Sequence, residues 1–188
     1  MYKHEYSASP VIVYGFHGTD EKCAYDVILG KIPHLSKSEN TWDWLGTGIY
    51  FWEANPQRAW EWAKEHKKNP AVIGAIISLG NCLNLLESDS LIKLQIAYKT
   101  YQEITKKQGL RPTKNFQNRN YLDCAVINTV CNDYTKLLEE KPYDTVRGVF
   151  WEGQALYPSA SFREKNHIQI CVRNPERILG YFNPFKDN

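Results

Sequence analysis

The chain has 188 residues, of which 43% are hydrophobic and 23% are charged, and its formal net charge is +2. This length suits one globular domain, and the small net charge gives little support to a dedicated nucleic-acid-binding protein. Its five cysteines have no metal-ligand spacing, which argues against a metal site and a disulfide scaffold and favours a reducing cytoplasm. Residues 1–10 are polar and no apolar run is long enough to span a bilayer, so we expect no signal peptide and no membrane partner.

The first predicted elements are a strand and a helix. A β-branched and aromatic run at residues 11–17 predicts a strand that ends at His17. Asp20 suits the N-cap of the helix that follows, and Gly30 suits a left-handed position at its end.

A second strand and helix are predicted next. We expect a brief extended segment at residues 42–45, a turn at residues 46–48 and a strand at residues 49–52. Asn55 followed by Pro56 predicts the start of a helix, because Asn suits the N-cap and Pro loses no hydrogen bond at the first helical position. The side of this helix that we expect to be buried consists of Ala59, Trp60, Trp62, Ala63 and His66.

The rest of the chain changes from helices to strands. Residues 71–79 form an apolar run of strand length, and Ser88 is expected to cap a long helix that reaches about Lys107. The sequence predicts a loop at residues 108–120 and an amphipathic helix at residues 122–138. Three further predicted strands complete an α+β domain, at residues 145–151, 167–172 and 178–182.

Two short motifs offer groups for binding a ligand. His17, Gly18 and Thr19 lie where a strand passes into a helix, so that a ligand could approach the backbone at Gly18 beside two polar side chains. Gly48 precedes an aromatic strand in which Tyr50 could stack on a planar heterocycle. Taken alone, the first motif also suits a structural turn, and the second a bulge at a sheet edge.

In this order, the two motifs resemble the ADP-ribosyltransferases of the diphtheria-toxin and poly(ADP-ribose) polymerase class. The resemblance implies one domain over residues 1–188, with a mixed, mostly antiparallel split sheet flanked by helices, and NAD⁺ as substrate. It implies that His17 contacts the adenosine ribose and the nicotinamide amide, and that Tyr50 stacks on the nicotinamide ring. A second aromatic residue near that ring would be Trp60 or Trp62.

A third segment, which begins at His167, is similar to the strand that carries the family's catalytic glutamate. The alignment puts Gln169 at that position, where a neutral amide supplies less charge than a carboxylate to an oxocarbenium-like transition state. Family members without this glutamate resemble enzymes that transfer a single ADP-ribose, or inactive ones. Glu152 and Glu164 are the two nearby carboxylates that we expect to compensate, although either also suits a solvated surface.

The expected function follows from this resemblance. It implies a mono-ADP-ribosyltransferase of the kind found among bacterial toxins and phage-defence effectors, which modifies a protein or a nucleic acid and has a neutralising antitoxin as a further partner. Three alternatives stay open: an NAD⁺ glycohydrolase, a non-catalytic module that binds NAD⁺ or ADP-ribose, and the RNA 2′-phosphotransferases that share this fold.

The arrangement of the site can also be predicted. We expect His17 and Tyr50 to face each other across one cleft, with Gln169 at its floor. Arg147 and Arg163 are expected either to pair with the pyrophosphate, whose geometry suits a guanidinium, or to form ordinary surface ion pairs.

Overall fold

The computed structural model describes residues 11–117, 119–134 and 139–185 of the chain. Two expectations therefore lie outside the described residues. One is the absence of a signal peptide at residues 1–10, and the other is the last part of the helix expected at residues 122–138.

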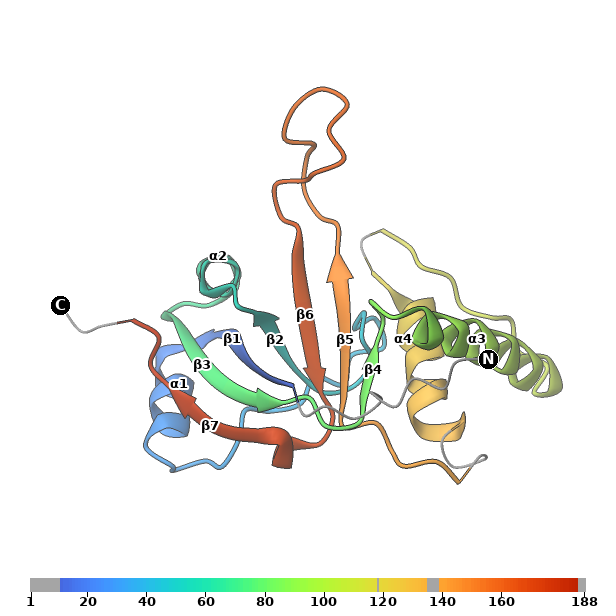
Figure 1. Cartoon of the computed structure of the whole chain (residues 1–188), viewed down its shortest axis with the longest axis horizontal. Helices are drawn as coiled ribbons and strands as arrows, with labels where there is room; N and C mark the ends of the chain where they lie inside the picture. The colour runs from blue at the N-terminus through green and yellow to red at the C-terminus, as the bar shows by residue number, and fades with distance from the viewer. Residues whose placement is uncertain (1–10, 118, 135–138, 186–188) are drawn as a thin grey trace.

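Seven strands of the described residues form one sheet in the middle of the molecule (Figure 1). They are β1 (Ile12–Asp20), β2 (Ile49–Glu53), β3 (Pro70–Ser78), β4 (Cys82–Asn84), β5 (Thr145–Phe150), β6 (His167–Val172) and β7 (Ile178–Phe182). Their order across the sheet is β4-β5-β6-β2-β1-β3-β7, and only β4 and β5 pair in parallel. The α+β class and the mostly antiparallel sheet are thus confirmed.

Four α-helices of the described residues flank this sheet. Near β1 and β3 lie α1 (Glu21–Ile28) and α2 (Pro56–His66), whereas α3 (Ser88–Lys107) and α4 (Tyr121–Asn128) lie beyond β4 (Figure 1). The expected N-caps of the first two helices are confirmed, since Asp20 accepts a hydrogen bond from the Lys22 amide and Asn55 accepts one from the Arg58 amide. The cap expected at Ser88 is wrong, because Glu87 occupies the N-cap position of α3 without a side-chain bond.

The sheet has two parts that are joined at a narrow point. β1 pairs with β2 at only two positions, Gly15 with Glu53 and Phe16 with Trp52. By contrast, β1 pairs with β3 along its full length of nine residues. Beyond Phe16, β1 and β2 separate, which creates the split that the family resemblance implies.

A hydrophobic core lies on each face of the sheet. One cluster contains Phe51 and Ile73 together with residues of α1, and the other contains Leu83 and Ile127 together with residues of α3 and α4. Tyr50 packs against the second cluster although its neighbour Phe51 belongs to the first, because successive strand residues point to opposite faces.

Three of the expected segments differ from the structure that forms there. Residues 42–45 form turns instead of an extended segment, held by a hydrogen bond from the Gly46 amide to the Asp43 carbonyl group. β1 continues past His17 to Asp20. The helix expected at residues 122–138 is interrupted, since α4 ends at Asn128 and a π-helical segment, Thr129–Tyr134, follows.

Candidate active site

A cavity of about 730 Å³ opens where β1 and β2 separate. This volume falls within the range of about 300–1,000 Å³ that is typical of sites for small molecules and cofactors. Its walls come from β1, β2, α2, β6 and the loops beside them. Seven of the expected site residues line it: His17, Gly18, Thr19, Tyr50, Trp62, Glu152 and Gln169.

His17 lies at the point where the two strands part. Its Nδ1 atom is 2.7 Å from the carbonyl oxygen of Tyr50. Because a carbonyl oxygen only accepts, Nδ1 carries the hydrogen and Nε2 keeps a lone pair. Burial lowers the pKa of His17, and Lys67 lowers it further against the opposing effect of the bond to Tyr50. His17 is therefore a neutral acceptor at pH 7, and it contacts Tyr50 through the backbone rather than across an open cleft.

Tyr50 presents a ring that is fixed in place. Its hydroxyl group donates to the Gly46 carbonyl oxygen over 2.6 Å and accepts from the Leu45 amide over 2.9 Å. Burial raises the pKa of Tyr50 far above its usual value, so the hydroxyl group stays protonated. A rigid aromatic ring with an anchored hydroxyl group is well suited to stacking on a flat ligand.

Tryptophans supply further aromatic walls. Of the two alternatives from α2, Trp62 lines the cavity and Trp60 does not. The ring of Trp62 stacks on His66, with centroids 4.6 Å apart and an angle of 15° between the planes. Trp52 also lines the cavity and was missed by sequence reasoning. Because it follows Tyr50 by two residues in a strand, the period of two could have revealed it.

Gln169 is oriented by a histidine that sequence reasoning also missed. His167 is buried, and its Nδ1 atom donates to the Lys165 carbonyl oxygen over 2.7 Å, which leaves a lone pair on Nε2. The Nε2 amide nitrogen of Gln169 lies 3.2 Å from the Nε2 atom of His167 and donates a hydrogen bond to it. The Oε1 atom of Gln169 has no hydrogen-bond partner among the described residues, so the amide offers the cavity an acceptor.

The protonation state of His167 supports this arrangement. Burial lowers the pKa of His167, whereas the Lys165 carbonyl group and Glu152 oppose that effect and Arg58 adds to it. The ring also stacks on Phe150, with centroids 5.2 Å apart. The orientation assigned to the Gln169 amide requires a neutral imidazole, because only an unprotonated Nε2 atom of His167 can accept its hydrogen bond.

Only one of the two expected carboxylates reaches the cavity. Glu152 lines it and forms an ion pair with Arg58, with Oε2 and Nη2 3.0 Å apart. Arg58 also pairs with Glu61 at 2.6 Å, and its role in the site was not predicted. Glu164 instead accepts a hydrogen bond from a backbone amide within the loop between β5 and β6, and it is not among the residues that line the cavity.

The two glycines of the motifs have packing roles. A Cβ atom at Gly48 would lie 2.5 Å from Cys171 Sγ, so this glycine lets β2 approach β6, and it does not line the cavity. A Cβ atom at Gly18 would lie 2.4 Å from the Ala59 carbonyl oxygen, so Gly18 lets α2 approach β1. Close approach of a ligand is therefore not what Gly48 requires, whereas Gly18 both packs against α2 and lines the cavity.

The pyrophosphate role expected for two arginines is wrong, because neither side chain lines the cavity. Arg147 forms a two-point ion pair with Glu53, over 2.6 and 2.8 Å, as the alternative interpretation predicted. Arg163 donates to a backbone carbonyl group and lies over the ring of Trp151. The cationic side chains that do line the cavity are Lys37, Arg58 and Lys67.

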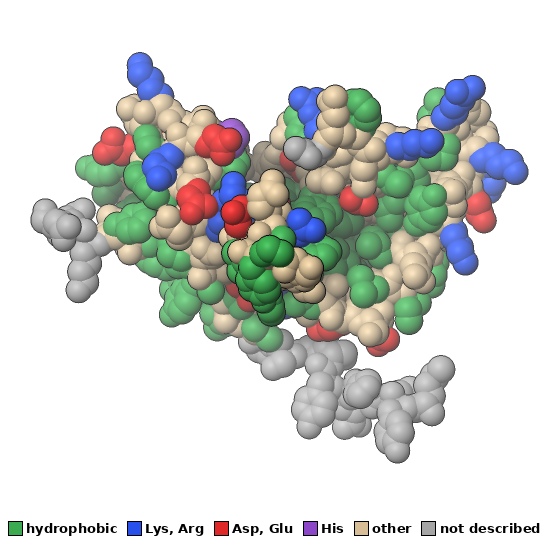
Figure 2. Space-filling view, turned by 90° about the horizontal axis from the view of Figure 1, so that it is seen from above, with side chains coloured by type: hydrophobic (Ala, Val, Ile, Leu, Met, Phe, Trp, Pro, Cys, Tyr) green, Lys and Arg blue, Asp and Glu red, His purple; other side chains and the backbone are tan. Residues whose placement is uncertain are grey.

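A long loop rises beside the cavity. It connects β5 to β6 and projects beyond the rest of the molecule (Figure 1). Figure 2 looks down on its tip, where hydrophobic side chains gather. More than half of the surface of Trp151, Leu156, Tyr157 and Phe162 is exposed. Because Glu152 lies at the base of this loop, an apolar surface adjoins the cavity.

Two further findings concern the described residues only. They contain no group of three or more His, Cys, Asp or Glu side chains placed to hold a metal ion. None of the helices they form has the length and apolar character needed to cross a membrane.

Comparison with known proteins gives a similarity over most of the chain. An uncharacterized protein of Methanocaldococcus jannaschii is 29% identical to it, in an alignment that covers 87% of this chain and 83% of that protein. No family model matches the chain, and no solved structure matches it significantly. Since the relative's description names no activity or ligand, any function for this chain has to be argued from the cavity.

Proposed function

We propose that the chain is an NAD⁺-dependent mono-ADP-ribosyltransferase. One observation carries this proposal: His17, Tyr50 and Gln169 come from three different strands and line a single cavity of a size that suits a cofactor. Their order along the chain is the order that the resemblance to ADP-ribosyltransferases implies.

Each side chain has a role in binding. The fixed ring of Tyr50 stacks on the nicotinamide, and Trp62 covers the same ring from the helix side. The lone pair on Nε2 of His17 accepts a hydrogen bond from a ribose hydroxyl group. Lys67, which lines the cavity, supplies positive charge for the pyrophosphate.

The reaction breaks the bond between the nicotinamide nitrogen and ribose C1′. The electron pair stays on the nitrogen, so nicotinamide leaves as a neutral molecule and positive charge develops on the ribose. Oε1 of Gln169 orients a ribose hydroxyl group, and the carboxylate of Glu152 stabilises the developing charge. The acceptor then bonds to C1′ and releases a proton. If the acceptor is water, the product is free ADP-ribose.

The acceptor of the proposed transfer is a protein or a nucleic acid. The resemblance favours a toxin or phage-defence effector that acts in the cytoplasm and has a neutralising antitoxin as partner. Mass spectrometry of cell protein and RNA after expression tests this setting, and attached ADP-ribose is the expected result. Free ADP-ribose without any modified macromolecule would instead identify a glycohydrolase.

A non-catalytic module is the second candidate, and two observations favour it. Gln169 is neutral, and the carboxylate of Glu152 is already paired with Arg58. Such a module would bind NAD⁺ or ADP-ribose and release no nicotinamide.

The test is nicotinamide release from NAD⁺ by the purified protein. We expect Glu152→Gln to lower the rate on the order of 10²-fold, the typical cost of losing one preorganised charge-stabilising group. Glu164→Gln is the matched control, because it makes the same chemical change outside the cavity and should keep the full rate. NAD⁺ binding with no release above that of His17→Ala would reject the enzyme and leave the binding module.

A further inference from the structure

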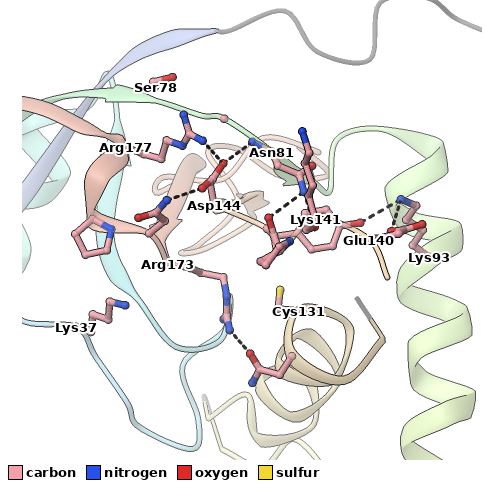
Figure 3. Close-up of a pocket in the computed structure, with 16 residues that line it drawn as sticks. Lys37, Ser78, Asn81, Lys93, Cys131, Glu140, Lys141, Asp144, Arg173 and Arg177 are labelled. Atoms are coloured by element: carbon pink, nitrogen blue, oxygen red, sulfur yellow. Dashed lines mark hydrogen bonds and ion pairs between the residues drawn. The ribbon is translucent and has the colours of Figure 1, made fainter. Parts of the chain in front are cut away.

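A second cavity lies at the opposite end of β5 and β6. Its volume is about 1,020 Å³, and its lining includes Asp144, which precedes β5, and Arg173, which follows β6 (Figure 3). The cavity proposed for NAD⁺ takes Glu152 and Gln169 from the other ends of the same two strands. The two cavities share Lys37 as a lining residue.

The lining of the second cavity carries an excess of positive charge. Five cationic side chains and two carboxylates line it. Both carboxylates already form ion pairs, Asp144 with Arg177 at 2.9 Å and Glu140 with Lys93 at 3.7 Å. The three cations that have no carboxylate partner among the described residues are Lys37, Lys141 and Arg173.

Asp144 does not provide a free negative charge at this site. Burial opposes its ionisation, but hydrogen bonds from Arg177, Asn174 and the Asn81 amide outweigh that effect and lower the pKa of Asp144. The carboxylate is thus ionised and occupied by protein donors. Figure 3 shows these donors converging on it.

Arg173 is held in position by neutral groups of the described residues. Its Nη1 atom donates to the Thr47 carbonyl oxygen over 3.0 Å and to Asn128 Oδ1 over 3.1 Å, and Nη2 donates to Asn132 Oδ1 over 2.7 Å. All three acceptors are neutral, and no carboxylate of the described residues pairs with this guanidinium. A fixed guanidinium matches the geometry of phosphate oxygens and loses little entropy when it binds them.

We propose that this second cavity is an anion site that binds a phosphate group of a nucleotide or of a nucleic-acid backbone. Arg173 is its fixed contact, and Lys37 and Lys141 supply two flexible charges. The proposal does not depend on NAD⁺ binding in the first cavity.

The test is a titration of the ¹⁵N-labelled protein with inorganic pyrophosphate, followed by NMR. We expect the largest shifts at the backbone amides of Asn81, Lys141 and Asn174. Shifts confined to residues 17–20 would overturn the proposal, because the anion would then occupy only the first cavity. A parallel titration with a short single-stranded oligonucleotide identifies the source: tighter binding than pyrophosphate indicates nucleic acid, and equal or weaker binding indicates a free nucleotide.

Two variants and a control locate the contacts. Lys141→Gln should weaken pyrophosphate binding by about 2- to 5-fold, the usual worth of an exposed ion pair. Arg173→Gln should weaken it by about 10-fold or more, because it removes a charge-assisted hydrogen bond. Lys107→Gln, at the exposed end of α3, changes the same charge far from the cavity and should have no effect.

The remaining outcomes are equally decisive. Unchanged binding by Lys141→Gln, or equal weakening by Lys107→Gln, would reject a local site. The variant Lys141→Gln keeps the first cavity intact, so its rate of nicotinamide release should match the wild type. The binding assay and the release assay therefore test the anion site and the proposed enzyme activity separately.

Discussion

The hydroxyl group and the ring of Tyr50 serve different purposes. Tyr50→Phe removes the hydroxyl group that pairs with Leu45 and Gly46, both buried, and should cost about 1–3 kcal/mol of unfolding free energy. The same variant keeps the ring and should keep NAD⁺ affinity. Tyr50→Ala also removes the ring and should lose about 1–3 kcal/mol of affinity, as in base stacking on aromatic side chains.

Urea unfolding and calorimetric titration with NAD⁺ measure these two effects separately. Tyr25→Phe serves as the control, because this tyrosine is exposed and its hydroxyl group forms no hydrogen bond with the described residues. An unchanged affinity for Tyr50→Ala would remove its ring from the site.

A substitution at Gly48 tests whether this glycine is needed for packing. An alanine Cβ atom there would lie 2.5 Å from Cys171 Sγ and 2.7 Å from the Val172 carbonyl oxygen. Relief of the second contact requires a shift of the backbone, so Gly48→Ala should cost about 1–3 kcal/mol of unfolding free energy, a usual cost of overpacking. Gly180→Ala is the matched control within the same sheet, since a Cβ atom there meets nothing within 4 Å. Equal urea midpoints for the two variants would contradict the packing role.

Residues of the candidate site differed in how far the sequence could predict them. His17, Tyr50 and Gln169 belong to motifs whose order carries information. For Arg147 the pyrophosphate role and an ordinary ion pair both stayed open, because its partner Glu53 is distant in sequence and only the pairing across the fold identifies it. The role of Arg58 depends on a contact of the same kind, with Glu152. His167, by contrast, contacts Gln169 two residues away in the same strand, so the strand period of two could have revealed it.

The β5–β6 loop is an element whose function can be tested as a unit. Its Leu156, Tyr157 and Phe162 are exposed, on a loop whose first residues include the cavity-lining Glu152, and they suit the docking of a macromolecular acceptor. Changing the three side chains to Ser should abolish transfer to the acceptor and leave nicotinamide release to water unchanged. Mass spectrometry of modified cell protein and RNA, beside the release assay, measures both.

Phe116→Ser provides the control for this experiment. Phe116 is exposed as well, but it lies in a different loop and does not line the cavity. Full transfer by the triple variant would exclude the loop from acceptor recognition. An equal loss in Phe116→Ser would indicate a general effect of removing surface hydrophobic groups.

Elements with local signals were predictable, whereas elements defined by distant partners were not. The starts of α1 and α2 follow from Asp20 and Asn55, whose caps form within the next turn. β4 is only three residues long and exists through parallel pairing with β5, so nothing local marks it. The turns at residues 42–45 bring Leu45 and Gly46 to the hydroxyl group of Tyr50. They form around Asp43, whose turn signal is hard to recognise in the sequence because tryptophans flank it.

At the scale of the whole molecule, the narrow join between β1 and β2 decides where a ligand can enter. Two residue pairs hold the two parts of the sheet together, and His17 extends that join by bonding to the Tyr50 carbonyl group. Protonation of His17 therefore affects the ligand site and the stability of the fold at once. Protonation of His167, which is held by hydrogen bonds at the start of β6, likewise affects both the ligand site and the stability of the fold.

The stability of the fold should consequently depend on pH in the range of histidine titration. The pKa values of His17 and His167 are both lowered, first of all by burial, whereas an unfolded histidine titrates near 6.5. Below about pH 6.5 the unfolded chain binds protons that the native protein does not bind. The free energy of unfolding then falls by up to about 1.4 kcal/mol per pH unit for each histidine. The stabilisation that comes from keeping the two histidines neutral is thus complete above that pH and is lost as the pH falls.

Urea unfolding at pH 7.5 and pH 5.5 measures this loss. The carboxylates whose pKa is lowered, Asp26, Glu61 and Asp144, stay ionised throughout this window and do not contribute to the difference. We expect His167→Gln to reduce the difference in unfolding free energy between the two pH values. His66→Gln, an exposed histidine at the end of α2, should leave that difference as it is. If wild type and His167→Gln lost the same free energy between the two pH values, His167 could not be neutral in the native state, and the orientation assigned to the Gln169 amide would fail with it.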